Sequence, residues 1–104
     1  MKRSVTGTLT GKQRRHLRAL AYDLKPTVSV GKSGITPAVV RSVDEAYSNS
    51  ELIKARLERS FEIDRKEGAQ QLATTTESHL VQVLGRTVLL YRPHPDEPEI
   101  ELPD

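Results

Sequence analysis

The stretch that decides the fold is residues 28–37, which read Val28-Ser29-Val30-Gly31-Lys32-Ser33-Gly34-Ile35-Thr36-Pro37. The short apolar run is typical of a buried strand, and a helix start follows the Gly-Lys-Ser-Gly turn at once. Thr36 is a favoured N-cap residue, and Pro37 is favoured in the first helical turn. The two glycines let backbone N–H groups converge beside the positive end of the helix dipole. We therefore predict a strand–turn–helix unit whose turn suits a nucleic-acid phosphate. The alternative is a tight turn without a ligand.

A first helix is expected to start at Thr10, because Thr10 and Gln13 fit a capping box. Apolar residues then recur at the spacing of one buried helical face, which consists of Leu17, Leu20, Ala21 and Leu24. Lys25 should end this helix, since it precedes Pro26 and the residue before a proline avoids the α conformation.

The rest of the chain alternates between helix and strand patterns. A second helix is expected to run from Thr36 to Asn49, and residues 51–58 alternate as a half-buried strand. Asp64 should cap a third helix that reaches about Thr76. Residues 80–84 and 87–91 predict a hairpin around the Gly85-Arg86 turn. The order α-β-α-β-α-β-β predicts the α/β class in its two-layer α+β form, with a four-stranded mixed sheet.

Length and composition indicate one small domain of 104 residues. The sequence contains no cysteine, which excludes disulfides and thiolate chemistry. No stretch resembles a secretory signal or a membrane span, so we expect a cytoplasmic protein without a membrane partner. We divide the chain into a flexible leader (residues 1–8), a single folded domain (9–93) and an acidic, proline-rich tail (94–104). Ile100 and Leu102 could still dock this tail on the body.

The charge is distributed unevenly along the chain. Residues 1–41 hold nine Lys or Arg and a single acid, Asp23, whereas residues 93–104 hold five acids and no base. A basic lobe around the Gly-Lys-Ser-Gly turn favours a polyanionic partner. The alternative is that the charge only keeps a small protein soluble.

The predicted first helix carries four cations, Lys12, Arg14, Arg15 and Arg18. They lack acidic partners one helical turn away, and such an unbalanced face favours a bound partner over a solvated surface. A second group of cations could extend the strip onto the sheet, namely Lys54, Arg56, Arg86 and Arg92. The acids near them in the sequence, Glu51, Glu58 and Glu62, make ordinary surface pairing an equal alternative.

No motif indicates catalysis or a cofactor. The three histidines, His16, His79 and His94, lack metal-ligand spacing, and the motifs of zinc peptidases and serine hydrolases are absent. Tyr47 and Tyr91 fit core-facing positions, which leaves few aromatic residues for base stacking. We expect binding through shape and phosphate, with little sequence readout.

Several of these segments resemble the CRM domain (chloroplast RNA splicing and ribosome maturation) in its stand-alone bacterial YhbY form. The matching segments are Leu9-Thr10-Gly11-Lys12-Gln13-Arg14, Leu24-Lys25-Pro26, Val30-Gly31-Lys32-Ser33-Gly34-Ile35-Thr36, Glu51-Leu52-Ile53-Lys54 and residues 85–93. The resemblance implies a fold related to the C-terminal domain of translation initiation factor three. It also implies RNA binding through the loop and association with precursors of the large ribosomal subunit. Carried over by position, the RNA-binding residues are Gly31, Lys32, Ser33 and Gly34, with Lys12, Lys25 and Lys54 beside them.

The sequence thus predicts a non-enzymatic RNA-binding protein that contacts the RNA backbone through a Gly-x-x-Gly loop and a basic helix. We expect a monomer that binds ribosomal RNA in large-subunit precursors and does not bind DNA. One alternative is a protein-interaction module that docks on ribosomal proteins of an assembling particle. Another is a small RNA-processing enzyme, which the lack of an acid–base or metal constellation disfavours.

Overall fold

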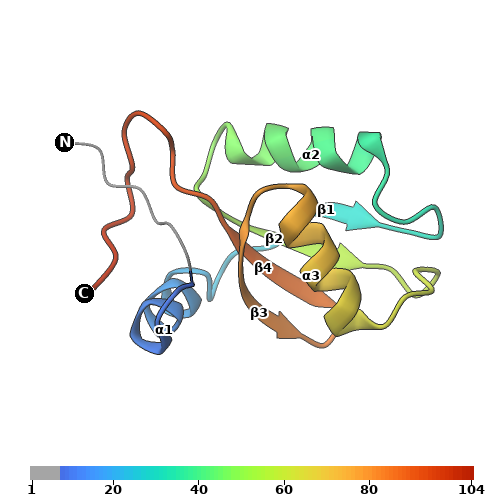
Figure 1. Ribbon diagram of the computed structural model, residues 1–104, viewed down its shortest axis with the longest axis horizontal. Helices are drawn as coiled ribbons and strands as arrows, with labels where there is room; N and C mark the ends of the chain where they lie inside the picture. The colour runs from blue at the N-terminus through green and yellow to red at the C-terminus, as the bar shows by residue number, and fades with distance from the viewer. Residues whose placement is uncertain (1–7) are drawn as a thin grey trace.

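The computed structural model describes residues 8–104 and contains the predicted order of three helices and four strands (Figure 1). The elements are α1 (Gly11–Leu20), β1 (Pro26–Val30), α2 (Pro37–Tyr47), β2 (Leu52–Leu57), α3 (Arg65–Thr75), β3 (His79–Leu84) and β4 (Thr87–Tyr91). Apart from Thr8, the predicted leader lies outside the described residues. Within residues 8–104, none of the helices is long and apolar enough to cross a membrane.

The four strands form one mixed sheet in the order β1-β2-β4-β3. β1 pairs in parallel with β2, because α2 connects them as a crossover, while β4 pairs antiparallel with both β2 and β3. The two-residue turn of the hairpin places Leu84 opposite Thr87, and Gly85 adopts a φ of 59° there. The left-handed conformation explains the glycine. The fold is α+β with a four-stranded mixed sheet, as the sequence predicts.

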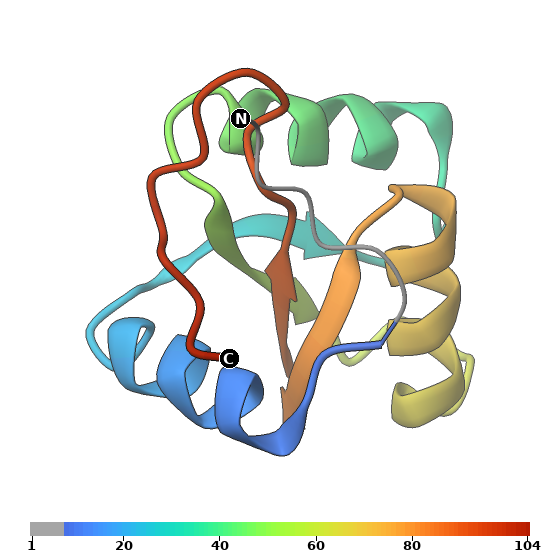
Figure 2. The ribbon, with the colours of Figure 1, turned by 60° about the vertical axis from the view of Figure 1, so that its left-hand side comes forward.

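One face of the sheet, here called the closed face, packs against α2 and α3 (Figure 2). Its apolar core alternates along the strands, as the sequence predicts for β2, where Ile53, Ala55 and Leu57 are all buried. Val43 and Leu72 bring α2 and α3 onto the same core. The helix starts also follow prediction, with N-caps at Thr10, Thr36 and Asp64.

The opposite face, here called the α1 face, carries a second and smaller core. Leu17 and Ala21 pack there against sheet residues such as Leu89 and Tyr91. Leu102, near the C-terminus, also packs into this core and is only 5% exposed. Figure 2 shows the C-terminal segment, residues 94–104, descending from the end of α2 to α1. Gln13 Nε2 donates a hydrogen bond of 3.1 Å to the carbonyl of Pro103, so the segment is attached to α1.

The end of α1 differs from prediction. The helix ends at Leu20, not at Lys25, and a turn over residues 21–23 leads into β1. Leu20 and Leu24, expected on the buried face, are 50% and 36% exposed. Leu17 and Ala21 are the residues of this region that reach the second core, and the chain turns directly after them. The N–H of Ala21 is shared between the carbonyls of Leu17 and Arg18, which tightens and closes the helix.

Candidate nucleic-acid interface

The Gly31–Gly34 loop connects the end of β1 to the start of α2. It is a tight turn in which the N–H of Gly34 donates to the carbonyl of Gly31 at 3.0 Å. Gly34 has a φ of 76°, so the turn itself favours glycine there. Gly31 has no such requirement, and a Cβ at this position would meet nothing closer than Ser60 Oγ at 3.6 Å. Neither packing nor turn geometry therefore accounts for the first glycine.

The middle of the loop offers free hydrogen-bond donors. Lys32 and Ser33 are exposed, and their backbone N–H groups have no partner within the described part of the chain. Thr36 Oγ1 occupies the N–H of Val39 at 3.2 Å, and Pro37 has no N–H to offer. Donors available to an anion thus include the N–H groups of Lys32 and Ser33, beside the positive end of α2.

The four cations of α1 lie at the other end of the sheet from the loop (Figure 1). Lys12 and Arg15 are exposed, and Arg14 and Arg18 are partly buried. Across residues 8–104 the structure shows no ion pair to any of the four. These four cations are thus not ion-paired, and they do not form one cluster with the loop.

Lys54 lies between these two regions, on the α1 face of β2. It shares a hollow of about 340 Å³ with Arg18. Its ammonium donates to the carbonyl of Leu24 at 2.9 Å, which fixes it beside the turn after α1. Arg56 follows two residues later on the same face and lies 3.9 Å from Glu58. Arg18 and Lys54 therefore place positive charge on this face of the sheet, and Glu58 balances part of the charge of Arg56 toward the loop.

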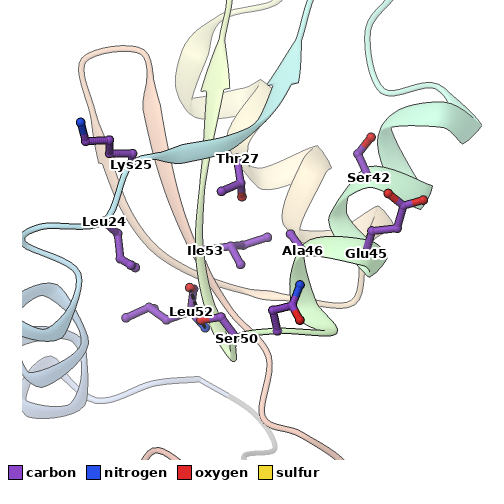
Figure 3. A pocket seen from close by; sticks show the side chains of 10 residues that line it. Leu24, Lys25, Thr27, Ser42, Glu45, Ala46, Ser50, Leu52 and Ile53 are labelled. Carbon is purple, nitrogen blue, oxygen red and sulfur yellow. Dashed lines mark hydrogen bonds between the residues drawn. The ribbon is translucent and has the colours of Figure 1, made fainter.

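Lys25 is separate from this strip. It lies on the rim of a hollow of about 370 Å³ between the start of β1 and α2. Figure 3 shows its side chain directed away from that hollow, whose α2 wall carries Ser42 and Glu45. The carboxylate of Glu45 makes this hollow a poor place for a phosphate.

Arg92 has a structural role. Its guanidinium pairs with Asp44 at 2.9 Å, donates to the carbonyl of Thr76 at 2.9 Å and lies 4.1 Å from the centre of the Tyr47 ring. Arg92 is thus paired, but with Asp44 and not with Glu51, Glu58 or Glu62, the acids of the surface-pairing alternative. Burial raises the pKa of Tyr47 to about 12, against the lowering effects of its hydrogen bond to Ser78 and of the charge of Arg92. Tyr47 and Tyr91 are both buried, as predicted.

Surface pairing, one of the two alternatives for the bases of the sheet, does not involve Glu51. Glu51 is only 6% exposed. Its carboxylate accepts the backbone N–H groups of His94, Glu99 at 2.8 Å and Ile100 at 2.7 Å. Glu51 therefore anchors the C-terminal segment. The sequence held one signal for this role: a carboxylate directly before an apolar strand, in a chain whose tail ends in isolated apolar residues.

The described residues offer no metal centre, since no three His, Asp or Glu side chains gather there. His79 stacks on the ring of Tyr91 with centroids 5.9 Å apart, which places it at the edge of the second core.

The family model of the CRS1 / YhbY (CRM) domain matches residues 9–92. The chain belongs to this family. A Bacillus subtilis member named "Probable RNA-binding protein YqeI" is 39% identical over 95 residues, which are 91% of this chain and 99% of that protein. A Haemophilus influenzae member named "RNA-binding protein" is 32% identical over 96 residues, 92% of this chain and 96% of its own length. The solution structure of SAV1595 from Staphylococcus aureus has the same fold, with a TM-score of 0.77 and 42% identity, and covers 92% of this chain and all of that one.

Proposed function

We propose that this CRM-domain protein binds RNA without enzymatic activity and acts in assembly of the large ribosomal subunit. Two relatives carry names that describe them as RNA-binding proteins, which supports RNA as the partner. The observation that carries the proposal is Gly31, a glycine that neither the fold nor the turn requires. A bare backbone at an exposed loop lets a phosphate approach closely.

In this proposal the N–H groups of Lys32 and Ser33 donate to one phosphate, and the Lys32 ammonium neutralises a neighbouring phosphate. Arg18 and Lys54 contact the backbone further along the sheet, and Lys12, Arg14 and Arg15 extend the positive field over α1. Because the loop and α1 lie at opposite ends of the sheet, one RNA strand would cross the α1 face to touch both (Figure 1). About four neutralised phosphates give a salt slope near −3 for log affinity.

The test is RNA binding at several salt concentrations by the wild type, Lys32→Ala, Gly31→Ala and the control Lys66→Ala. Lys66 is also exposed but lies in the first turn of α3, so its loss removes the same charge outside the Gly31–Gly34 loop. Lys32→Ala should weaken binding to all sequences and reduce the slope by about 1. Gly31→Ala should fold normally and bind about tenfold more weakly, because the added methyl keeps the phosphate from the backbone. This loss corresponds to about 1.4 kcal/mol of binding free energy. Equal losses for Lys32→Ala and Lys66→Ala would contradict the loop contact.

The ribosomal part of the proposal needs a separate experiment. Sedimentation of cell extracts should place the protein with large-subunit precursor particles, and Lys32→Ala should release it toward the top of the gradient. If the protein bound no naked RNA yet still sedimented with the particles, docking on ribosomal proteins would be the better explanation.

A further inference from the structure

Tyr22 stands apart from the other two tyrosines of this chain. Tyr47 and Tyr91 are 8% and 1% exposed, whereas Tyr22 is 85% exposed. It lies in the turn directly after α1 and forms one wall of the hollow that Arg18 and Lys54 share. A large ring held in solvent at the rim of a hollow is a surface on which a planar partner can stack.

The hollow combines apolar walls with positive charge. Leu84 is 68% exposed on its β3 side, and Ala21 and Leu89 are buried beneath it. The charged residues that line it are Arg18 and Lys54, and no carboxylate does. Asp23 follows Tyr22 in the chain, and Glu58 accepts the hydroxyl of Ser29 and lies near Arg56. Apolar walls with a cationic rim suit a partner that is flat and anionic.

We propose that this hollow receives an unpaired base of a single RNA strand, which stacks on Tyr22 while its phosphates contact Arg18 and Lys54. The inference rests on the proposed RNA binding and adds a base contact to a site otherwise built from phosphate contacts. Lys54 and Arg56 are two residues apart on β2, about 7 Å, so the strip between the hollow and the Gly31–Gly34 loop follows one strand. Stacking on an aromatic ring accepts any base, so the contact selects unpaired RNA over duplex without reading sequence.

The experiment measures binding of a fluorescent single-stranded RNA of about ten nucleotides, a length within the range that single-strand binders cover. Tyr22→Ala should weaken binding about tenfold, whereas Tyr22→Phe keeps the ring and should bind like the wild type. The salt slope should stay the same for both, because neither change removes a charge. Leu20→Ala is the matched control, since Leu20 is 50% exposed close by but does not line the hollow.

A second probe tests whether the base itself is the contact. The same RNA with all of its bases removed keeps every phosphate, and it tests a contact that accepts any base. For the wild type, this RNA should lose at least as much affinity as Tyr22→Ala does with the intact RNA. For Tyr22→Ala, removal of the bases should cost less than it costs the wild type, because the stacking contact is already absent.

The outcomes separate this inference from the proposed function. Normal binding by Tyr22→Ala, together with weak binding by Lys32→Ala, would overturn the stacking contact and leave RNA binding by the loop intact. Failure of the folded wild type to bind RNA would overturn both. If Tyr22→Ala instead abolished self-association in sedimentation equilibrium, the hollow would be an interface between copies of this chain and the inference would be wrong. Circular dichroism is the check that each variant is folded.

Discussion

The two faces of the sheet are built in different ways. The closed face packs on α2 and α3, and each of these helices lies between two of the strands in the sequence. The α1 face is covered only in part, by the first helix and the last residues of the chain, which meet where Gln13 bonds Pro103. The rest of that face stays open and carries Lys54, Arg56 and the hollow beside Tyr22.

This difference assigns separate tasks to the two faces. A fully covered core supplies most of the hydrophobic stabilisation, because burial of apolar area is the dominant favourable term in folding. The partly covered face supplies a surface on which polar and aromatic side chains remain accessible. If this division is correct, substitutions on the closed face should unfold the whole domain, and those on the α1 face should loosen the chain ends first.

The largest effect is expected from a pair of truncations, Leu90→Ala on the closed face and Leu102→Ala on the α1 face. Leu90 is fully buried and belongs to the larger core, so its truncation should lower the free energy of unfolding by about 4 kcal/mol. Leu102 lies near the end of the chain, where the structure can relax, so its truncation should cost about 2 kcal/mol. Urea unfolding measures both values.

Hydrogen exchange tells the two variants apart further. Leu102→Ala should speed exchange at the N–H groups of Glu99 and Ile100, which Glu51 accepts, before it affects the sheet. Equal losses of stability, with uniform exchange in both variants, would break the distinction between the faces.

A second comparison uses pH. The pKa of Tyr47, which packs on the closed face, is raised to about 12 from its usual 10.0. Between these values the unfolded chain loses the Tyr47 proton while the folded chain keeps it. The contribution of Tyr47 to the free energy of unfolding is therefore fully present below pH 10 and falls as the pH rises toward 12. The free energy of unfolding falls by about 3 kcal/mol at most through this ionisation.

Tyr47→Phe should remove this part of the alkaline unfolding curve. At neutral pH the variant should lose about 1 kcal/mol, because the hydroxyl no longer donates to Ser78 Oγ. An alkaline curve that Tyr47→Phe leaves unchanged would show that the closed face does not shield this hydroxyl from ionisation.

Glu51→Gln tests the anchor of the C-terminal segment. Both carboxylate oxygens of Glu51 accept backbone N–H groups of the segment. The amide of glutamine keeps one of these oxygens but places an NH2 group, itself a donor, where the other oxygen now accepts. We expect a loss of about 1–2 kcal/mol, with faster exchange confined to residues 94–104. Exchange that rises equally in β2 and β4 would mean that the segment and the sheet unfold as one unit.

The sequence predicts the closed face well because its signals are local. Alternation in β2, the caps at Thr36 and Asp64 and the Gly85-Arg86 turn each act within a few residues. The α1 face depends on contacts between the chain ends, such as the hydrogen bond from Gln13 to Pro103. The spacing of apolar residues along the sequence does not indicate such contacts. Glu51 and the early end of α1 were therefore missed: the first depends on where the tail lies, and the second depends on how α1 packs on the sheet.

The candidate site divides along the same line. The loop could be found from Gly31 to Gly34 alone, since its glycines, lysine and helix start lie in one segment. The neighbourhood of Arg18 and Lys54 could not, because it arises from the packing of α1 on the sheet. Tyr22 was assigned no role, since its exposure follows from the end of α1 two residues earlier.

The smallest effect is expected at Gly68. This glycine lies inside a helix, where the tight packing of the closed face leaves no room for a side chain. Gly68 is buried in α3 beneath the ring of Phe61, and a Cβ there would lie 2.3 Å from Phe61 Cε2. Alanine favours the helix by about 1 kcal/mol over glycine, but displacement of a buried ring costs about 1–3 kcal/mol. Gly68→Ala should therefore lower stability by about 1 kcal/mol, as measured by thermal or urea unfolding.

The sign of this effect should reverse in a background that makes room. Phe61→Leu removes the ring and by itself destabilises the closed core, since Phe61 is only 6% exposed. In that variant the added methyl of Gly68→Ala meets no ring and fills part of the space left behind. It should then stabilise the domain by about 1 kcal/mol, through helix propensity and restored packing. A loss of the same size in both backgrounds would place the cost in the α3 backbone and not in the packing of the closed face.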